Sequence, residues 1–305
     1  MTAVTAFELS WWAVEWQLGI APAPLIGAYL GLTLLAAGVA MAVRLLLRLK
    51  PAATGPGPVL LAMGLVAVGA SAFLPLKYAI PKLVPFWLDG PLAGGERALF
   101  GADPWLILDR LLGKATVPLD WLYASWLAIQ SLVLFLVILA RPSPAKSRAM
   151  IAHSLAWLLL GVVAAVLFAS AGPIFYDRLF GGSFYHGLGE SLRSRGAWLA
   201  LAESDAMWTS FRTAQPGMVA GISAMPSLHV AISLWIFLAA RTLVPRAAVP
   251  AFAYFVLIWI ASVQLGWHYV LDGLAGALGM LAVWHLAGLV EKRGRGALTK
   301  PERLL

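Results

Sequence analysis

The chain has 305 residues, of which 61% are hydrophobic and 12% charged, with 22 Lys and Arg against 14 Asp and Glu. A soluble domain averages about 45–50% apolar and about 25% charged residues, so this composition excludes an ordinary soluble protein and indicates a membrane protein. The absence of cysteine excludes disulfides, thiolate metal ligands and cysteine nucleophiles.

The apolar residues lie in long continuous runs along the chain. A membrane-spanning helix needs about 20 mostly apolar residues, whereas a transmembrane barrel would show alternating segments of about 10 residues. The runs therefore predict an all-α polytopic membrane protein with about seven transmembrane helices. The predicted spans are residues 23–46, 57–80, 121–140, 149–172, 226–244, 247–266 and 269–290.

Three segments outside these spans carry further signals. The Trp-rich stretch at residues 7–16 is typical of a membrane interface. Residues 81–120 include PWLILDRLLG, which predicts a short interfacial helix, and residues 173–224 include a predicted helix near 196–213. Loops of this length are uncommon unless they are functional.

The basic residues predict the orientation of the chain. With the N-terminus outside, the inner loops and the tail hold 13 of the 22 basic residues but only Glu291 and Glu302 of the 14 acidic ones. An excess of Lys and Arg marks cytoplasmic loops, so the N-terminus is expected outside and the C-terminus inside. This distribution accounts for the net charge of +8 without a nucleic-acid partner. The inner basic residues are Arg44, Arg48, Lys50, Arg141, Lys146, Arg148, Arg241, Arg246, Lys292, Arg293, Arg295, Lys300 and Arg303.

A first chemical motif is GISAMPSLHVA at residues 221–231. Pro226 predicts the first turn of a helix, because a missing N–H has no cost there. Ser227 and His229 are then expected in the same first turn. Free N–H groups and the positive end of the helix dipole favour a phosphate at such a position.

A second motif is LGWHYVLDGLAG at residues 265–276. His268 and Asp272 are four residues apart and share one face of a helix, so the carboxylate can accept the imidazole N–H and stabilise an imidazolium. The predicted orientation places both motifs outside, at similar depth. There are two alternatives: the histidines hydrogen-bond only the backbone, or His229, His268 and Asp272 form a zinc site. A histidine on the same face as a His-x-x-x-Asp pair favours a catalytic site.

PSLH followed by HYVLD resembles the type 2 phosphatidic acid phosphatase superfamily of membrane lipid phosphatases. AMPSLHVA and LGWHYVLDGLAG are most similar to the branch that includes inositol phosphorylceramide synthase. The resemblance implies a six-helix catalytic core, expected at residues 57–290. Residues 1–56 then hold an interfacial segment and an extra transmembrane helix, and residues 291–305 form a basic cytoplasmic tail.

The resemblance also implies roles for matching residues. His268 corresponds to a nucleophile that forms a phosphohistidine, and Asp272 to the carboxylate that orients it. His229 corresponds to the general acid for the leaving alkoxide, and Ser227 to a phosphate-holding hydroxyl. No metal or other cofactor is implied.

The chain departs from the family pattern in its basic residues. Many members have an Arg six residues before the nucleophilic His, where this chain has Ser262. The usual Lys-x6-Arg-Pro motif is absent, and its nearest imitation, KYAIPKLVP at residues 77–85, has Val84 in place of Arg.

Other cations are therefore expected to bind the phosphate. Arg178 is favoured because it follows the fourth predicted helix, where the usual motif would lie, and Arg110 and Lys114 come next. All three are also explained as interfacial side chains that extend toward water. The outer cations considered are Lys77, Lys82, Arg97, Arg110, Lys114, Arg178, Arg193, Arg195 and Arg212.

Three functions remain open. The first is a lipid phosphatase, in which water attacks the phosphohistidine, and the second is a head-group phosphotransferase, in which an alcohol or sugar hydroxyl attacks. The third is a lipid transporter or flippase with a degenerate site. For either enzyme the expected partners are a lipid phosphate or phospholipid and the surrounding lipids of a plasma (inner) membrane, with the active site on the periplasmic or extracellular side. Candidates for lining an acceptor pocket are Trp105, Tyr176, Tyr185 and Trp208.

Overall fold

A computed structural model of the protein describes residues 26–46, 56–213 and 221–298. Every regular element within these residues is a helix, which agrees with the predicted all-α class. The Trp-rich stretch at residues 7–16 lies outside the described residues.

Helices are found at the positions of all seven predicted spans. One of them, α8, continues through a π-helical turn, η2 (Leu159–Ala164), into α9 (Ala165–Leu167). The helices at these positions are α2 (Ile26–Leu46), α3 (Pro56–Leu83), α7 (Trp126–Ile138), α8 (Pro144–Leu158), α13 (Leu228–Leu243), α14 (Ala248–Gln264) and α15 (Val270–Leu298).

Several helices are apolar enough for a multi-pass membrane protein. Within the described residues, three are also long enough to cross a membrane: Pro144–Leu167, Pro245–Gln264 and Val270–Arg295. A fourth is counted if the pair Pro104–Ala124 and Trp126–Ile138, bent by 45°, forms one span. The number of seven spans, like the orientation, stays a prediction.

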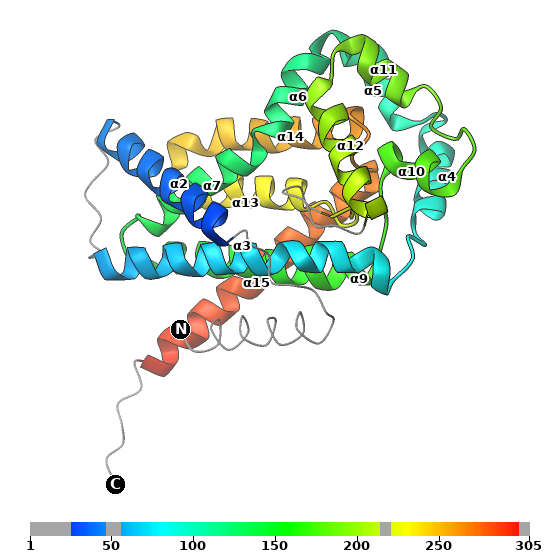
Figure 1. The fold of residues 1–305 in the computed structure, drawn as a ribbon. Coiled ribbons are helices and arrows are strands. Elements are labelled where there is room, and N and C mark those ends of the chain that lie inside the picture. The colour runs from blue at the N-terminus through cyan, green and yellow to red at the C-terminus, as the bar shows by residue number, and fades with distance from the viewer. Residues whose placement is uncertain (1–25, 47–55, 214–220, 299–305) are drawn as a thin grey trace.

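Short helices gather at one end of the bundle, where α13 and α15 also begin (Figure 1). We call them the cap. From the cap, α6 (Thr116–Ala124) leads into α7, and the 3-10 turn η1 (Gly113–Ala115) precedes α6. A second 3-10 turn, η3 (Pro245–Ala247), connects α13 to α14. The cap helices are α4 (Asp89–Phe100), α5 (Pro104–Leu112), α10 (Pro173–Phe180), α11 (Leu188–Arg195) and α12 (Trp198–Thr213). The predicted helices in PWLILDRLLG and near residues 196–213 are thus confirmed as α5 and α12.

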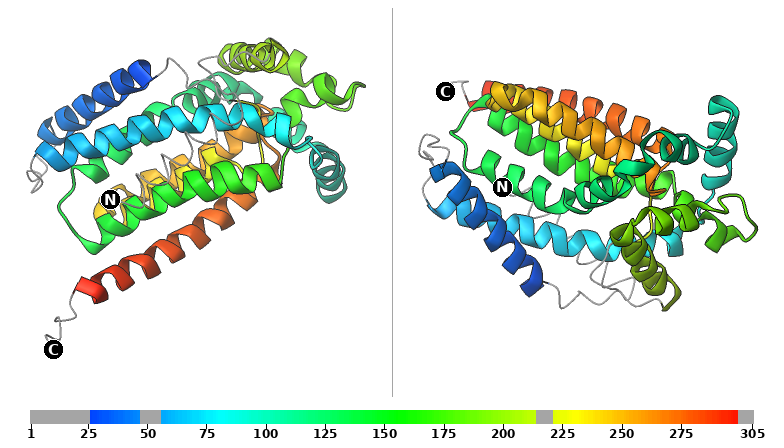
Figure 2. Two further views of the ribbon diagram at one scale, coloured as in Figure 1. Left: turned by 60° about the horizontal axis from the view of Figure 1, so that its bottom comes forward. Right: turned by 90° about the horizontal axis from the view of Figure 1, so that it is seen from above.

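Helix α13 forms the centre of the bundle, packed against α8, α14 and α15. Its Trp235 and Ile232 are fully buried. An indole N–H in an apolar interior needs a partner, and that of Trp235 donates to the Ala149 carbonyl of α8 at 2.8 Å. At the edge of the bundle, α2 packs against α3 and α7 (Figure 2). The centre of the bundle therefore holds the start of α13, and with it the first motif, in a fixed position.

Candidate active site

The first motif forms a capped helix start. Helix α13 begins at Leu228, and Ser227 is its N-cap, whose hydroxyl accepts the N–H of Val230 at 3.4 Å. His229 lies in the first turn, as predicted. The prediction that Pro226 and Ser227 also lie in this turn is wrong, because the capping hydroxyl of Ser227 ends the non-helical segment one residue after Pro226.

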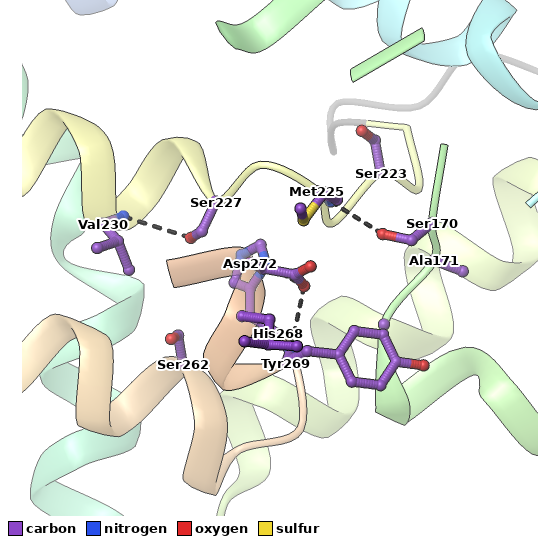
Figure 3. A network of polar contacts seen from close by, with 12 residues as sticks. Ser170, Ala171, Ser223, Met225, Ser227, Val230, Ser262, His268, Tyr269 and Asp272 are labelled. Carbon is purple, nitrogen blue, oxygen red and sulfur yellow. Dashed lines mark hydrogen bonds and ion pairs between the residues drawn. The ribbon is translucent and has the colours of Figure 1, made fainter. Parts of the chain in front are cut away.

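His268 lies in the turn between α14 and α15, and Asp272 lies in the first turn of α15 (Val270–Leu298). The prediction that both residues share one helix face is therefore wrong, because the helix begins two residues after His268. Nδ1 of His268 lies 3.4 Å from Oδ2 of Asp272, which accepts the N–H of Tyr269 at 3.0 Å (Figure 3). The backbone N–H of His268 donates to the carbonyl of Ser262 at 3.1 Å. Asp272 therefore lies beside Nδ1, although Nδ1 has no hydrogen-bond partner among the described residues.

The two motifs meet at the cap end of the bundle. The N–H of Ser227 donates to the carbonyl of Asp272 at 3.0 Å. The rings of His229 and His268 lie with their centroids 5.9 Å apart and their planes at 56°. The imidazoles are thus close enough to contact a single phosphoryl group, which agrees with the similar depth expected from the charge pattern.

Two aromatic side chains hold His229. Tyr123 of α6 stacks on the imidazole at a centroid distance of 4.6 Å, and Trp126 of α7 packs against it at 4.2 Å. The indole N–H of Trp126 also donates to the His229 carbonyl at 3.1 Å. Both aromatic side chains are buried. Neither was singled out from the sequence, because aromatic residues near a membrane interface are common.

Lys77 of α3 approaches the same site. Its Nζ donates to the carbonyl of Ser223, in the loop before α13, at 3.3 Å. The backbone of α3 lies so close that a Cβ at Gly221 would be 2.5 Å from the Lys77 carbonyl oxygen. The ammonium group also acts electrostatically on His268. The sequence signal for Lys77 is that it begins the incomplete motif at residues 77–85.

The favoured cations lie elsewhere in the cap. Arg178 donates to Asp205 at 2.7 Å and lies over the ring of Trp208. Arg110 on α5 and Lys114 in η1 are both exposed. The described contacts bring none of the three to the histidines, so their role in phosphate binding stays a prediction.

The electrostatics of the turn favour a neutral His268. Burial, and secondarily the Lys77 ammonium, lower the pKa of His268 to about 3, while a backbone hydrogen bond to Ala224 acts in the opposite direction. A neutral imidazole at physiological pH has a free lone pair on one ring nitrogen. The side chain is therefore in the form that a nucleophile needs.

Some buried polar atoms of the site have no hydrogen-bond partner among the described residues. They include Oδ1 of Asp272 and the indole N–H of Trp267. Leaving such atoms unpaired in a buried place is costly. Within the same part of the chain, no group of three or more His, Cys, Asp or Glu side chains is arranged to hold a metal ion.

The aromatic residues expected to line an acceptor pocket take different positions. Tyr176 contacts Phe180, Phe184 and Tyr185 in one cluster of the cap. Trp105 is buried, with its indole N–H unpaired among the described residues. A lining role for these residues stays a prediction.

These features define a helical membrane protein with paired histidines at the end of its bundle. The sequence profile of the PAP2 superfamily matches residues 96–286, which is more than half of the chain, and includes both histidine motifs. The chain belongs to the PAP2 superfamily. No curated protein and no solved structure matches it.

Proposed function

We propose that this protein is a membrane lipid phosphatase or phosphotransferase that acts through a phosphohistidine at His268. The observation that carries the proposal is the meeting of His229, His268 and Asp272, with a lysine at the same site. The PAP2 superfamily consists largely of phosphatase-type enzymes, which supports this class of reaction.

In the first step, Nε2 of His268 attacks the phosphorus atom of the substrate. A P–N bond forms as the P–O bond to the lipid alcohol breaks, and His229, as an imidazolium, donates its proton to the leaving oxygen. The negative phosphate favours this protonated form of His229. Asp272 accepts the Nδ1–H and stabilises the positive charge that develops on His268.

In the second step, a hydroxyl compound attacks the phosphohistidine. His229, now neutral, accepts the proton from the attacking oxygen, and the P–N bond breaks as the new P–O bond forms. With a phosphate monoester as substrate, water yields free phosphate. With a phosphodiester lipid as substrate, the histidine carries the head-group phosphate, and an alcohol or sugar hydroxyl yields a new phosphodiester. The charge on the transferred group is neutralised by Lys77 and by free N–H groups at the start of α13.

The transferase alternative is favoured by one departure from the family pattern. Ser262 occupies the position of the usual Arg, is fully buried, and donates its hydroxyl hydrogen to the carbonyl of Trp259 at 2.7 Å. No cation can act from this position. A substrate with less negative charge than a phosphate monoester, such as a phosphodiester lipid, fits this site better, as in the branch that includes inositol phosphorylceramide synthase.

The proposed setting is a plasma (inner) membrane with the histidines on its periplasmic or extracellular side. The support is the excess of Lys and Arg in the predicted inner loops and the separation of the cap from the opposite end of the bundle. A transporter with a degenerate site is the reading to adopt if no chemistry is found.

The test is an assay of purified protein on lipid phosphates and phospholipids, in EDTA, with and without alcohols. Phosphate release that is unaffected by alcohols indicates the phosphatase, and a new phosphodiester that needs an alcohol indicates the transferase. We expect His268→Ala to lose activity by about 10³-fold or more, and His186→Ala, which alters an exposed histidine of the cap, to keep it. Equal activity in wild type and His268→Ala would exclude the phosphohistidine.

A further inference from the structure

Helix α4 carries two buried carboxylates toward the site. Asp89 is 0% exposed and Glu96 is 2% exposed. The two residues are seven positions apart, so they lie on the same face of the helix. Acidic side chains are almost never fully buried unless they are paired, and neither forms an ion pair among the described residues. Their partners are backbone N–H groups and a phenol, and all of these lie beside the catalytic turns.

Asp89 receives hydrogen bonds on both oxygens. Its Oδ2 accepts the N–H of Ala171 at 2.7 Å, and its Oδ1 accepts the N–H of Gly172 at 2.9 Å. Oδ1 also accepts the hydroxyl of Tyr269 at 2.9 Å. Tyr269 follows His268 directly, so one carboxylate links the loop between α9 and α10 to the nucleophile's turn.

The loop that Asp89 holds touches both histidine turns. The carbonyl of Ser170 accepts the N–H of Ala224 at 2.8 Å, and its hydroxyl accepts the N–H of Met225 at 3.0 Å (Figure 3). At Gly172, where φ is +94°, a Cβ would clash with the carbonyl oxygen of Trp267. Residues 170–172 therefore lie between the segment that leads to His229 and the segment that leads to His268, and they contact both.

Glu96 holds the start of α15. Its Oε1 accepts the N–H of Leu271 at 2.8 Å. The first N–H groups of a helix have no partner within the helix, and here a side chain from another helix supplies one. Leu271 precedes Asp272, so this contact fixes the turn of α15 that carries the orienting carboxylate.

We propose that α4 is a positioning helix whose Asp89 and Glu96 hold the two histidine-bearing turns in register with each other. The inference rests on the proposed function, since the register matters only if His229 and His268 act on one phosphoryl group. Neither carboxylate contacts the reacting atoms in this assignment. Each acts through backbone N–H groups of neighbouring segments, and Asp89 also through the hydroxyl of Tyr269.

The two positions differ in what they tolerate. The hydrogen bond from Leu271 to Glu96 uses Oε1, and the amide oxygen of Gln can accept it in the same way. Asp89 uses both oxygens as acceptors, and Asn offers only one, since its NH2 group would face an N–H donor. Glu96→Gln is therefore expected to rescue what Glu96→Ala loses, whereas Asp89→Asn is expected to behave like Asp89→Ala.

The experiment compares these four variants with wild type and with Glu190→Ala, which alters an exposed acid of α11. Steady-state kinetics on the best substrate are measured beside hydrogen–deuterium exchange in detergent. In both Ala variants and in Asp89→Asn, we expect kcat to fall about 10–100-fold with little change in KM, because small displacements of reacting groups have effects of this size. Deuterium uptake should rise in residues 222–226 and 265–276 and stay unchanged within α13.

Several outcomes would overturn the inference. Unchanged kcat in Glu96→Ala and Asp89→Ala would do so, as would failure of Glu96→Gln to rescue. Increased exchange throughout α13 would show general loosening of the bundle and not positioning. If wild type is inactive on every substrate, the proposed function fails separately, and the role of α4 is then judged by hydrogen–deuterium exchange alone. Increased deuterium uptake confined to residues 222–226 and 265–276 supports the positioning role, and unchanged uptake there refutes it.

Discussion

The bundle and the cap are held together by different kinds of contact. At the centre of the bundle, α13 is stabilised by fully buried apolar side chains such as Ile232 and Trp235. In the cap, acidic side chains make many of the contacts: Asp109 pairs with Arg195 at 3.2 Å, and Asp120 accepts the N–H groups of Leu199 and Ala200 at 2.9 Å.

The acidic residues outside the predicted inner loops therefore have a structural role. Several of them satisfy N–H groups at loops and helix starts that no regular element could satisfy. The site lies where the two regions meet. One lysine reaches it from the bundle, and two carboxylates support it from the cap, so substitutions in the bundle, at the junction and in the cap should have effects of different kind and size.

The largest of these effects is expected from Lys77, on the bundle side. Lys77→Met keeps the length of the side chain but removes the charge beside the histidines. We expect kcat/KM to fall about 100-fold, as when one preorganised charged or donor group is lost. The measurement is steady-state kinetics with Lys82→Met as control, because Lys82 lies on the same helix and is exposed. A small effect of Lys77→Met, with a large effect of Arg178→Met, would return the phosphate-binding role to Arg178.

A smaller effect, on stability, is expected at Glu96, where α4 of the cap meets the start of α15. Burial raises the pKa of Glu96 from its ordinary 4.5 to about 7, against the opposing hydrogen bond from Leu271. The folded protein thus holds this proton more tightly than the unfolded chain, and the stability that protonated Glu96 contributes is present below pH 4.5 and lost as pH rises through 7. Glu96→Gln cannot ionise, so its Tm should exceed that of wild type by a few degrees at pH 8, and the difference should vanish near pH 4. Thermal unfolding in detergent across this range provides the measurement, and a lower Tm for Glu96→Gln at pH 8 would show that the ionised carboxylate is stabilising.

The smallest effect is expected in the cap, at Arg195. Its side chain is 41% exposed, and its ion pair with Asp109 is open to water. Pairs of this kind contribute about 0.2–1 kcal/mol and weaken with salt. Arg195→Ala should leave kcat unchanged and lower Tm slightly, by an amount that high salt abolishes. A large, salt-independent loss would mean that the cap depends on this pair far more than its exposure indicates.

Local patterns were enough to predict much of the architecture. Helices lie at all seven predicted positions because a long apolar run can satisfy its backbone in a membrane by forming a helix, whatever its neighbours are. The spacing of His268 and Asp272 also predicts that their side chains meet, although the contact joins a turn residue to the first turn of α15 and not two residues of one helix face. Two local errors concern where a helix begins. Helix α13 begins after Pro226, where the hydroxyl of Ser227 caps it, and α15 begins at Val270, after His268.

The sequence by itself thus determined the helical class, the two motifs and their meeting at one end of the bundle. Only the tertiary structure decided which other residues join them. Lys77 lies 146 positions from Ser223, and Glu96 lies 175 positions from Leu271. Contacts over such separations depend on how α3, α4 and α15 pack, and no periodicity within one segment encodes which face of a distant helix it will meet.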